Sequence, residues 1–110
     1  PAGRPAGKKP VQGELTGRII HVDRFGNLVT DITAGELTAL GADFSSLRVS
    51  LCGEQIQGIS EYYSQAGEGA LLALVGSSGR LEVAAGGRSA HNSLGRPGPD
   101  TVVTVNSGKV

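Results

Sequence analysis

The stretch LTGRIIHVDRFGNLVTDI, residues 15–32, decides how this chain can fold. Residues 15–22 are rich in β-branched side chains and predict a β-strand. Residues 28–32 have the same character and predict either a second strand or the far side of a bulge. The polar segment between them, residues 23–27, contains a glycine and predicts a turn. The stretch therefore indicates a β-rich fold.

Short strands continue along the rest of the chain. They are predicted at residues 47–51, 55–63, 71–75, 80–84 and 100–106. Only two short helical turns are expected, one opened by the capping box Thr33-Ala34-Gly35-Glu36 and reaching residue 40, the other over residues 89–94. Closing a sheet of about seven short strands protects its edges. The expected fold is therefore all-β, a small antiparallel β-barrel or sandwich with one or two short helical turns.

The composition excludes several classes of protein. A length of 110 residues fits one domain, and 18 glycines with 5 prolines exclude the long uninterrupted runs of a helix bundle. Ten basic and ten acidic residues give a formal net charge of zero, so no global field attracts nucleic acid. No apolar stretch reaches the ~18–20 residues of a membrane span. We therefore expect neither a nucleic-acid partner nor a membrane partner.

The single cysteine, Cys52, excludes an internal disulfide framework and fits a reducing compartment, so a cytoplasmic location is expected. Together with the two histidines, His21 and His91, it leaves too few soft ligands for a structural zinc site, and no metal is expected. Cys52 has no evident activating partner and is expected to be an inert thiol. His21, within a predicted strand, is interpreted as a satisfied or surface histidine rather than a base.

The first residues differ in composition from the remainder. Residues 1–10 hold three of the five prolines, three basic residues and no large apolar side chain. Such a segment cannot bury enough surface to fold. We expect residues 1–12 to be a flexible linker between two domains and residues 13–110 to be the β-barrel domain that follows it. An unstructured native tail is the alternative.

The segment DRFGN, residues 23–27, carries the chemistry that points to a ligand. A purine ring can stack on Phe25, and stacking on an aromatic side chain is worth ~1–3 kcal/mol per base. The Asn27 carboxamide can exchange two hydrogen bonds with N6 and N7 of adenine. The structural alternative is that Phe25 plugs the end of the barrel and Asn27 occupies a left-handed turn position.

The segment GSSGRLEVA, residues 76–84, offers exposed backbone N–H groups and hydroxyls to a polar ligand. It fits neither a phosphate-binding loop nor the nucleophile elbow of a serine hydrolase, because the spacing of both motifs is absent. The alternative is a plain hairpin turn with Arg80 and Glu82 solvated on the outer face. Of Tyr62 and Tyr63, neighbours on a predicted strand, at most one can line a given pocket.

Taken in order, these segments resemble one protein family over residues 13–105. The matching elements are DRFGNLVTDI, Tyr63-Ser64, GSSGRLEVA, Ser89-Ala90 with Leu94-Gly95, and residues 98–102. They are similar to the C-terminal domain of the S-adenosyl-L-methionine (SAM) hydroxide adenosyltransferases. These enzymes are adenosine-forming SAM hydrolases and relatives of the SAM-dependent fluorinase and chlorinase.

The resemblance implies a larger N-terminal domain followed by a small β-barrel domain, in a homotrimer. SAM would lie between the N-terminal domain of one subunit and the C-terminal domain of its neighbour, as substrate and without any cofactor. Water or hydroxide, a halide in the relatives, would attack C5′ of the ribose and displace methionine. The activating residues belong to the N-terminal domain, so no catalytic residue is expected in this chain and the chain alone is expected to be inactive.

The same resemblance implies that this domain binds the adenosine part of SAM. Phe25 would stack on adenine, Asn27 would hydrogen-bond its edge, Ser77 and the Ser78 backbone would contact the rest of the purine, and the backbone around Ala90 would close the pocket. The full expected set of substrate-binding residues is Phe25, Asn27, Tyr63, Ser77, Ser78, Glu82, Arg88 and Ala90.

Two departures from the family pattern stand out. Asp31 occupies a position where the family usually has Asn, which would alter a turn or the charge of the pocket. Ser78 matches the hydrolase branch better than the halogenating enzymes, which favours hydroxide as the nucleophile.

Two other classes of function remain open from the residues alone. One is a stand-alone β-barrel module that binds single-stranded nucleic acid, although a neutral chain with 4% aromatic residues lacks a basic groove and stacking aromatics. The other is a structural trimerisation domain without ligand contacts, which requires the 23–27 turn to be buried.

Overall fold

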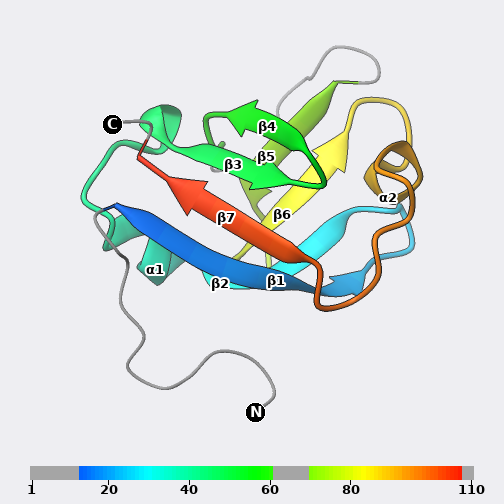
Figure 1. Cartoon of the computed structure of the whole chain (residues 1–110), viewed down its shortest axis with the longest axis horizontal. Helices are drawn as coiled ribbons and strands as arrows, with labels where there is room; N and C mark the ends of the chain where they lie inside the picture. The colour runs from blue at the N-terminus through cyan, green and yellow to red at the C-terminus, as the bar shows by residue number, and fades with distance from the viewer. Residues whose placement is uncertain (1–12, 61–69, 108–110) are drawn as a thin grey trace.

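The computed structural model describes residues 13–60 and 70–107. Their secondary structure is mainly β, as the sequence predicts (Figure 1). The strands are β1 (Glu14–Val22), β2 (Leu28–Thr33), β3 (Arg48–Leu51), β4 (Glu54–Gln57), β5 (Leu71–Val75), β6 (Arg80–Ala85) and β7 (Val102–Asn106). The helical segments are α1 (Ala34–Thr38), α2 (Ala90–Ser93) and a 3-10 turn, η1 (Phe44–Ser46), which the sequence analysis does not predict.

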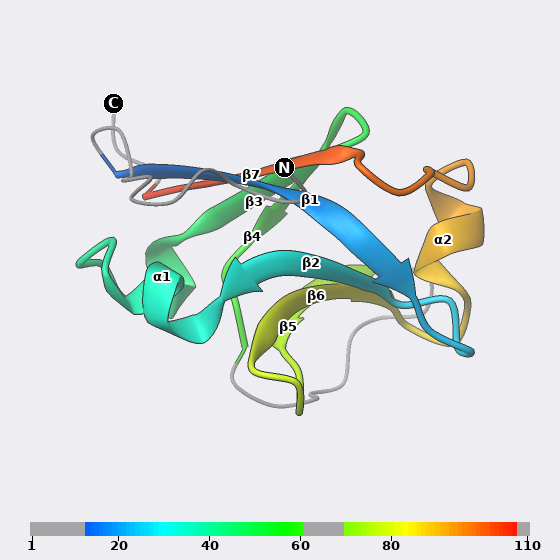
Figure 2. The ribbon, with the colours of Figure 1, turned by 90° about the horizontal axis from the view of Figure 1, so that it is seen from below.

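The seven strands form one antiparallel sheet in the order β4-β3-β7-β1-β2-β6-β5. The sheet curls until its two ends approach each other, which makes a nearly closed barrel (Figure 2). Ser60 joins the ends, since its N–H donates to the Ala73 carbonyl and its carbonyl accepts from the Val75 N–H, both at 2.9 Å. The expected barrel is confirmed.

The interior of the barrel is aliphatic. Alternate residues of the strands point inward, so that β3 buries Val49 and Leu51 while Ser50 between them stays half-buried. In β5 the adjacent residues Ala73 and Leu74 are both buried, so this part of the strand is covered on both faces.

The predicted capping box is present at α1. The Glu36 N–H donates to the Thr33 hydroxyl at 3.2 Å, and the Thr33 N–H donates to the Glu36 carboxylate at 2.9 Å. The helix ends at Thr38 rather than at residue 40.

The predicted strand over residues 55–63 is shorter than expected. β4 ends at Gln57, because Gly58 adopts a φ of 88°, which breaks the strand. Residues 61–63 of that prediction lie outside the described residues.

Cys52 and Gly53 form the two-residue turn between β3 and β4. Both have positive φ values, 51° and 79°, which is the backbone of a type I′ hairpin. Partial burial raises the pKa of the Cys52 thiol, so the reactive thiolate is disfavoured, in line with the expected inert thiol.

β1 and β2 approach unusually closely at Gly17. The pairing of the two strands shifts register between Ile19 and His21. A Cβ atom built on Gly17 would collide with the Ile32 side chain and lie 2.5 Å from Oδ1 of Asp31. Only glycine therefore allows this packing.

Gly17→Ala should lower the free energy of unfolding by about 1–3 kcal/mol, because the added methyl group must displace buried neighbours. Gly35→Ala is the matched control, since a Cβ there meets nothing closer than the Thr33 hydroxyl at 3.9 Å. The control replaces glycine within α1 and should stabilise by about 0.5–1 kcal/mol. Urea denaturation measures both. Equal stability of the wild type and Gly17→Ala would refute the close approach.

Candidate functional site

The turn over residues 23–27 is organised by Asp23. Oδ1 of its carboxylate accepts the N–H of Phe25 at 2.8 Å and that of Asn27 at 3.0 Å. The main chain closes the same turn twice, because the Asp23 N–H donates to the Asn27 carbonyl and the Gly26 N–H donates to the Asp23 carbonyl. Four hydrogen bonds within five residues make this a preformed turn.

The structure contradicts the alternative in which Phe25 plugs the end of the barrel and Asn27 occupies a left-handed turn position. Phe25 is 72% exposed and so does not plug the barrel. The positive φ, 84°, belongs to Gly26 and not to Asn27. Both parts of that alternative are therefore wrong. The guanidinium of Arg24 lies 5.9 Å from the centre of the Phe25 ring, within the range of a cation–π contact.

Asn27 is buried, with 6% of its surface exposed. Its Nδ2 donates to Oδ2 of Asp23 at 3.3 Å, so both oxygens of Asp23 are used within the turn. The carboxamide is thereby held at the base of the turn, while the Phe25 ring projects from it.

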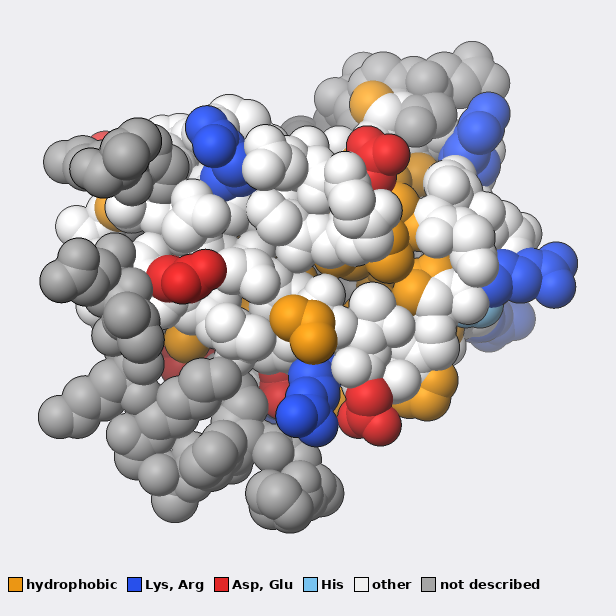
Figure 3. Space-filling view, viewed as in Figure 1, with side chains coloured by type: hydrophobic (Ala, Val, Ile, Leu, Met, Phe, Trp, Pro, Cys, Tyr) orange, Lys and Arg blue, Asp and Glu red, His pale blue; other side chains and the backbone are white. Residues whose placement is uncertain are grey.

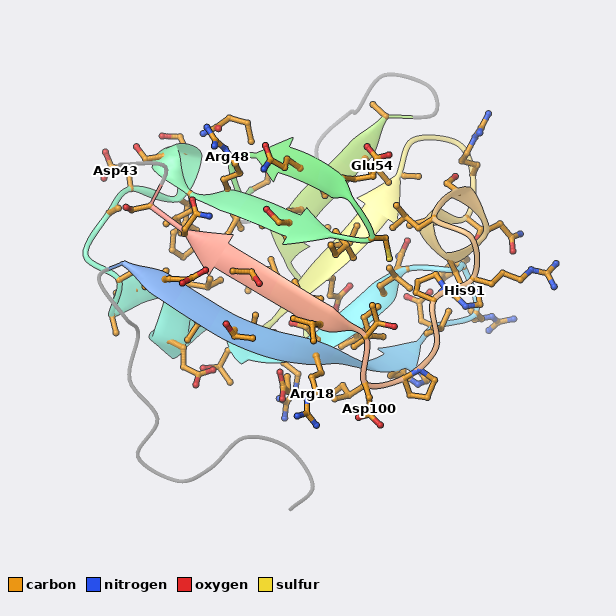
Figure 4. The ribbon with its side chains drawn as sticks, viewed as in Figure 1. Arg18, Asp43, Arg48, Glu54, His91 and Asp100 are labelled. Carbon is orange, nitrogen blue, oxygen red and sulfur yellow. The ribbon has the colours of Figure 1, made fainter. Side chains whose placement is uncertain are left out.

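The turn is fixed to the start of α2, and the two lie together at one end of the barrel (Figures 1 and 2). The His91 N–H donates to the Gly26 carbonyl at 2.8 Å, and Figure 4 shows His91 at this end. A Cβ on Gly26 would collide with Ser89, whose hydroxyl caps α2 by accepting the Asn92 N–H at 3.0 Å. Ala90, a predicted site residue, follows Ser89 and is fully buried.

The second predicted segment forms the tight turn between β5 and β6. The Gly79 N–H donates to the Gly76 carbonyl at 2.9 Å. Ser77 and Ser78 are exposed at the tip. The Ser78 hydroxyl donates to Oε2 of Glu82 at 3.4 Å, and that carboxylate lies so close to Gly76 that a Cβ there would collide with it. Glu82 is thus packed against the turn rather than freely solvated.

Glu82 links this turn to the Asp23 turn electrostatically. Partial burial and the nearby Asp23 carboxylate raise the pKa of Glu82 above its ordinary value, and the hydrogen bond from Ser78 opposes that shift. The β2–β6 pairing places Glu82 opposite Val29, two residues after Asn27. Glu82 is therefore within electrostatic reach of the Asp23 turn, whereas the turn of residues 76–79 lies at the α1 end of β2, where the Ala34 N–H donates to the Gly79 carbonyl at 2.9 Å.

Two other predicted site residues do not join this group. Arg88 lines a hollow on β4 and α2 whose described lining contains none of the other candidates. Tyr63 lies outside the described residues.

Asp31 acts within the sheet, where its Oδ1 accepts the Arg18 N–H at 2.9 Å. It therefore shapes the β1–β2 pairing.

The importance of Asp23 becomes apparent only in the structure. An Asp that precedes a glycine-containing turn and bonds the N–H two residues later is a known turn signal, and that signal could have identified it.

Across residues 13–60 and 70–107, no three His, Cys, Asp or Glu side chains gather to hold a metal ion. The helices in the same parts of the chain are too short to cross a membrane.

The carboxyl carbon of Glu82, followed by NMR, should titrate with a midpoint above 4.5, and Asp23→Asn should lower that midpoint by removing a neighbouring negative charge. Asp100→Asn is the matched control, since Asp100 pairs with Arg18 at 4.0 Å and does not act on Glu82 (Figure 4). Because the folded pKa is raised, the stability contributed by Glu82 is complete below 4.5 and declines as pH rises through the folded pKa. A midpoint unchanged by Asp23→Asn would show that the carboxylates do not interact.

Two solved structures share the fold of this chain. An uncharacterized conserved protein from Thermotoga maritima superposes with a TM-score of 0.71 at 24% identity, over 90% of this chain and 38% of that protein. A conserved hypothetical protein from Thermus thermophilus gives a TM-score of 0.63 at 27% identity, over 82% of this chain and 32% of that protein. The chain thus spans about a third of the length of both solved proteins. No curated protein matches it.

The family model of the SAM hydroxide adenosyltransferase C-terminal domain matches residues 17–103. That range contains the Asp23 turn, α2 and the turn before Glu82. The chain belongs to the SAM hydroxide adenosyltransferase family, as its C-terminal domain.

Proposed function

We propose that this domain holds the adenosine part of SAM in an enzyme that cleaves SAM to adenosine and L-methionine. Family membership supports SAM as the substrate. The observation that carries the proposal is the Phe25 ring, which is 72% exposed on a turn fixed by four hydrogen bonds. A large exposed aromatic ring on a rigid turn is a platform on which a flat heterocycle can stack.

The rigidity of the turn favours binding. A loop that orders only when its ligand arrives loses conformational freedom, which weakens the observed affinity. Here Asp23 and α2 hold Phe25 and Gly26 in place before any ligand binds. Most of the stacking free energy, about 1–3 kcal/mol, is therefore available to the complex.

Asn27 is proposed to read the edge of the base. The bond to Asp23 fixes the orientation of the carboxamide, a group that can both donate to and accept from the edge of an adenine. Because Asn27 is nearly buried, the base must approach at the foot of the Phe25 ring. The backbones at Ser77, Ser78 and Ala90 would complete the contacts with the purine.

The chemical step is a displacement at C5′ of the ribose. The oxygen of water or hydroxide forms a bond to C5′, the bond from C5′ to sulfur breaks, and its electrons neutralise the sulfonium to give the thioether of methionine. A proton of the attacking water is released. Such a displacement requires nucleophile, carbon and sulfur in line, so the contribution of this domain is positioning. No catalytic residue is proposed in this chain, nor any cofactor or metal.

The remaining parts of the active site are proposed to come from an N-terminal domain of a neighbouring subunit in a homotrimer, with the enzyme in the cytoplasm. The segment of residues 1–12 would then be the linker between the two domains. The nucleic-acid alternative is not favoured, because Phe25 is the only large exposed aromatic among residues 13–60 and 70–107.

In the intact protein that carries this domain, Asn27→Ala should weaken adenosine binding about tenfold or more, since a bidentate contact with a base is worth about 1–3 kcal/mol. Phe25→Leu keeps an apolar side chain but removes the aromatic face, and should also weaken binding. Isothermal titration calorimetry measures both effects. Asn92→Ala, at an exposed Asn of α2, is the matched control and should bind as the wild type does.

The 110-residue chain alone should not convert SAM to adenosine and methionine. Equal adenosine affinity of the wild type and Asn27→Ala would refute the proposed base contact. Turnover by the isolated chain would refute the division of labour between the domains.

A further inference from the structure

A hollow of about 480 Å³ opens where the barrel fails to close. β4 and β5 are the two ends of the sheet, and the bridge at Ser60 joins them near Leu74. The hollow is lined by all four residues of β4, by Leu71 at the start of β5, and by Arg88 and Leu94 around α2. Figure 3 shows a recess with a hydrophobic floor in this region, and Figure 4 places Glu54 beside it. Its volume lies within the range of ligand pockets.

One wall of the hollow is the outer edge of β4. The Gly58 N–H donates to the Leu47 carbonyl at 2.7 Å, which fixes residues 47 and 58 as a hydrogen-bonded pair. Along an antiparallel ladder, hydrogen-bonded pairs alternate with pairs that are not hydrogen-bonded to each other. The backbone N–H and C=O groups of Gln55 and Gln57 therefore point away from β3, toward the hollow, and among the described strands only β3 pairs with β4.

The floor and rim of the hollow differ in character. Ile56 is buried in the floor, and Leu71 and Leu94 beside it are half-buried against the core. Glu54 and Arg88 stand at the hollow as exposed side chains of opposite charge, and they do not pair with each other.

We propose that this hollow binds the carboxyl-terminal end of an extended peptide whose last residue is aliphatic. The peptide backbone adds to the edge of β4 that no strand within residues 13–60 and 70–107 pairs with, as in recognition by strand addition. The terminal carboxylate meets the Arg88 guanidinium, which suits a carboxylate because it can donate two parallel hydrogen bonds. The last side chain covers the floor formed by Ile56, Leu71 and Leu94, and Glu54 favours a basic side chain upstream.

This site is separate from the proposed base-binding turn and does not depend on it. α2 stands between the two, since its first residues contact Gly26 while Leu94 lines the hollow. A variant that loses peptide binding can therefore keep adenosine binding, and a variant that loses adenosine binding can keep peptide binding.

The test uses the intact protein that carries this domain and two peptides, N-acetyl-Gly-Lys-Thr-Leu with a free carboxylate and the same peptide as its C-terminal amide. Amidation should weaken binding at least tenfold in calorimetry. Arg88→Gln should weaken binding of the free acid by the same factor, because amidation and this substitution remove the same contact, that between the guanidinium and the terminal carboxylate. The two peptides should therefore bind to Arg88→Gln with equal affinity. Arg96→Gln, at an exposed arginine outside the hollow, is the matched control and should keep the preference for the free acid.

NMR adds a readout of position. The backbone amides of Gln55 and Gln57 should shift on addition of the free acid, and an unchanged spectrum elsewhere would show that Arg88→Gln remains folded. The proposal is overturned if neither peptide binds at millimolar concentration, if the amide binds as well as the acid, or if Arg88→Gln keeps the tenfold preference. It is also overturned if free leucine binds as tightly as the peptide, since strand addition would then contribute nothing.

Discussion

The carboxylate of Asp23 is the interaction on which the candidate site depends. Its two oxygens accept hydrogen bonds from the backbone of Phe25 and Asn27 and from the Asn27 side chain. Hydrogen bonds to a charged acceptor are stronger than those between neutral groups, and here three of them fall on one side chain. Without Asp23 the N–H groups of Phe25 and Asn27 would lose these partners, and the main-chain hydrogen bonds of the turn and the bond from His91 would have to hold it by themselves.

The barrel contributes by bringing distant segments to this turn. Gly26 and the start of α2 are more than 60 residues apart in sequence, yet the Gly26 carbonyl accepts a hydrogen bond from His91 and its α-carbon leaves no room for a side chain beside Ser89. β6 lies next to β2 and places Glu82 near Asp23. The barrel thus brings the start of α2 and Glu82 of β6 close to the Asp23 turn, although the three are distant in sequence.

Local patterns predicted much of this fold. The β-branched runs, the capping box at Thr33 and the glycine-bounded turn before Arg80 each depend on residues that are neighbours in sequence, so they could be identified without coordinates. The strand order could not, because it depends on which hydrophobic faces pack together across the whole chain. The early end of β4 follows from the positive φ of Gly58; a glycine within a strand pattern indicates a bend, but it does not show that the strand stops there.

The candidate site was predictable in part. Phe25 and Asn27 were identified from residue types, but their very different exposure, 72% and 6%, arises from the geometry of the Asp23 turn. The separation of Arg88 from that turn likewise depends on the position of α2, which only tertiary packing fixes.

Amide hydrogen exchange on the free protein tests most directly whether the turn is preformed. In a preformed turn the N–H groups of Asn27 and His91 should exchange slowly without ligand, at rates approaching those of the barrel strands, because both are held by hydrogen bonds at 3.0 and 2.8 Å. Exchange of these two amides at the rate of an unstructured peptide, while the strands stay protected, would contradict a preformed turn.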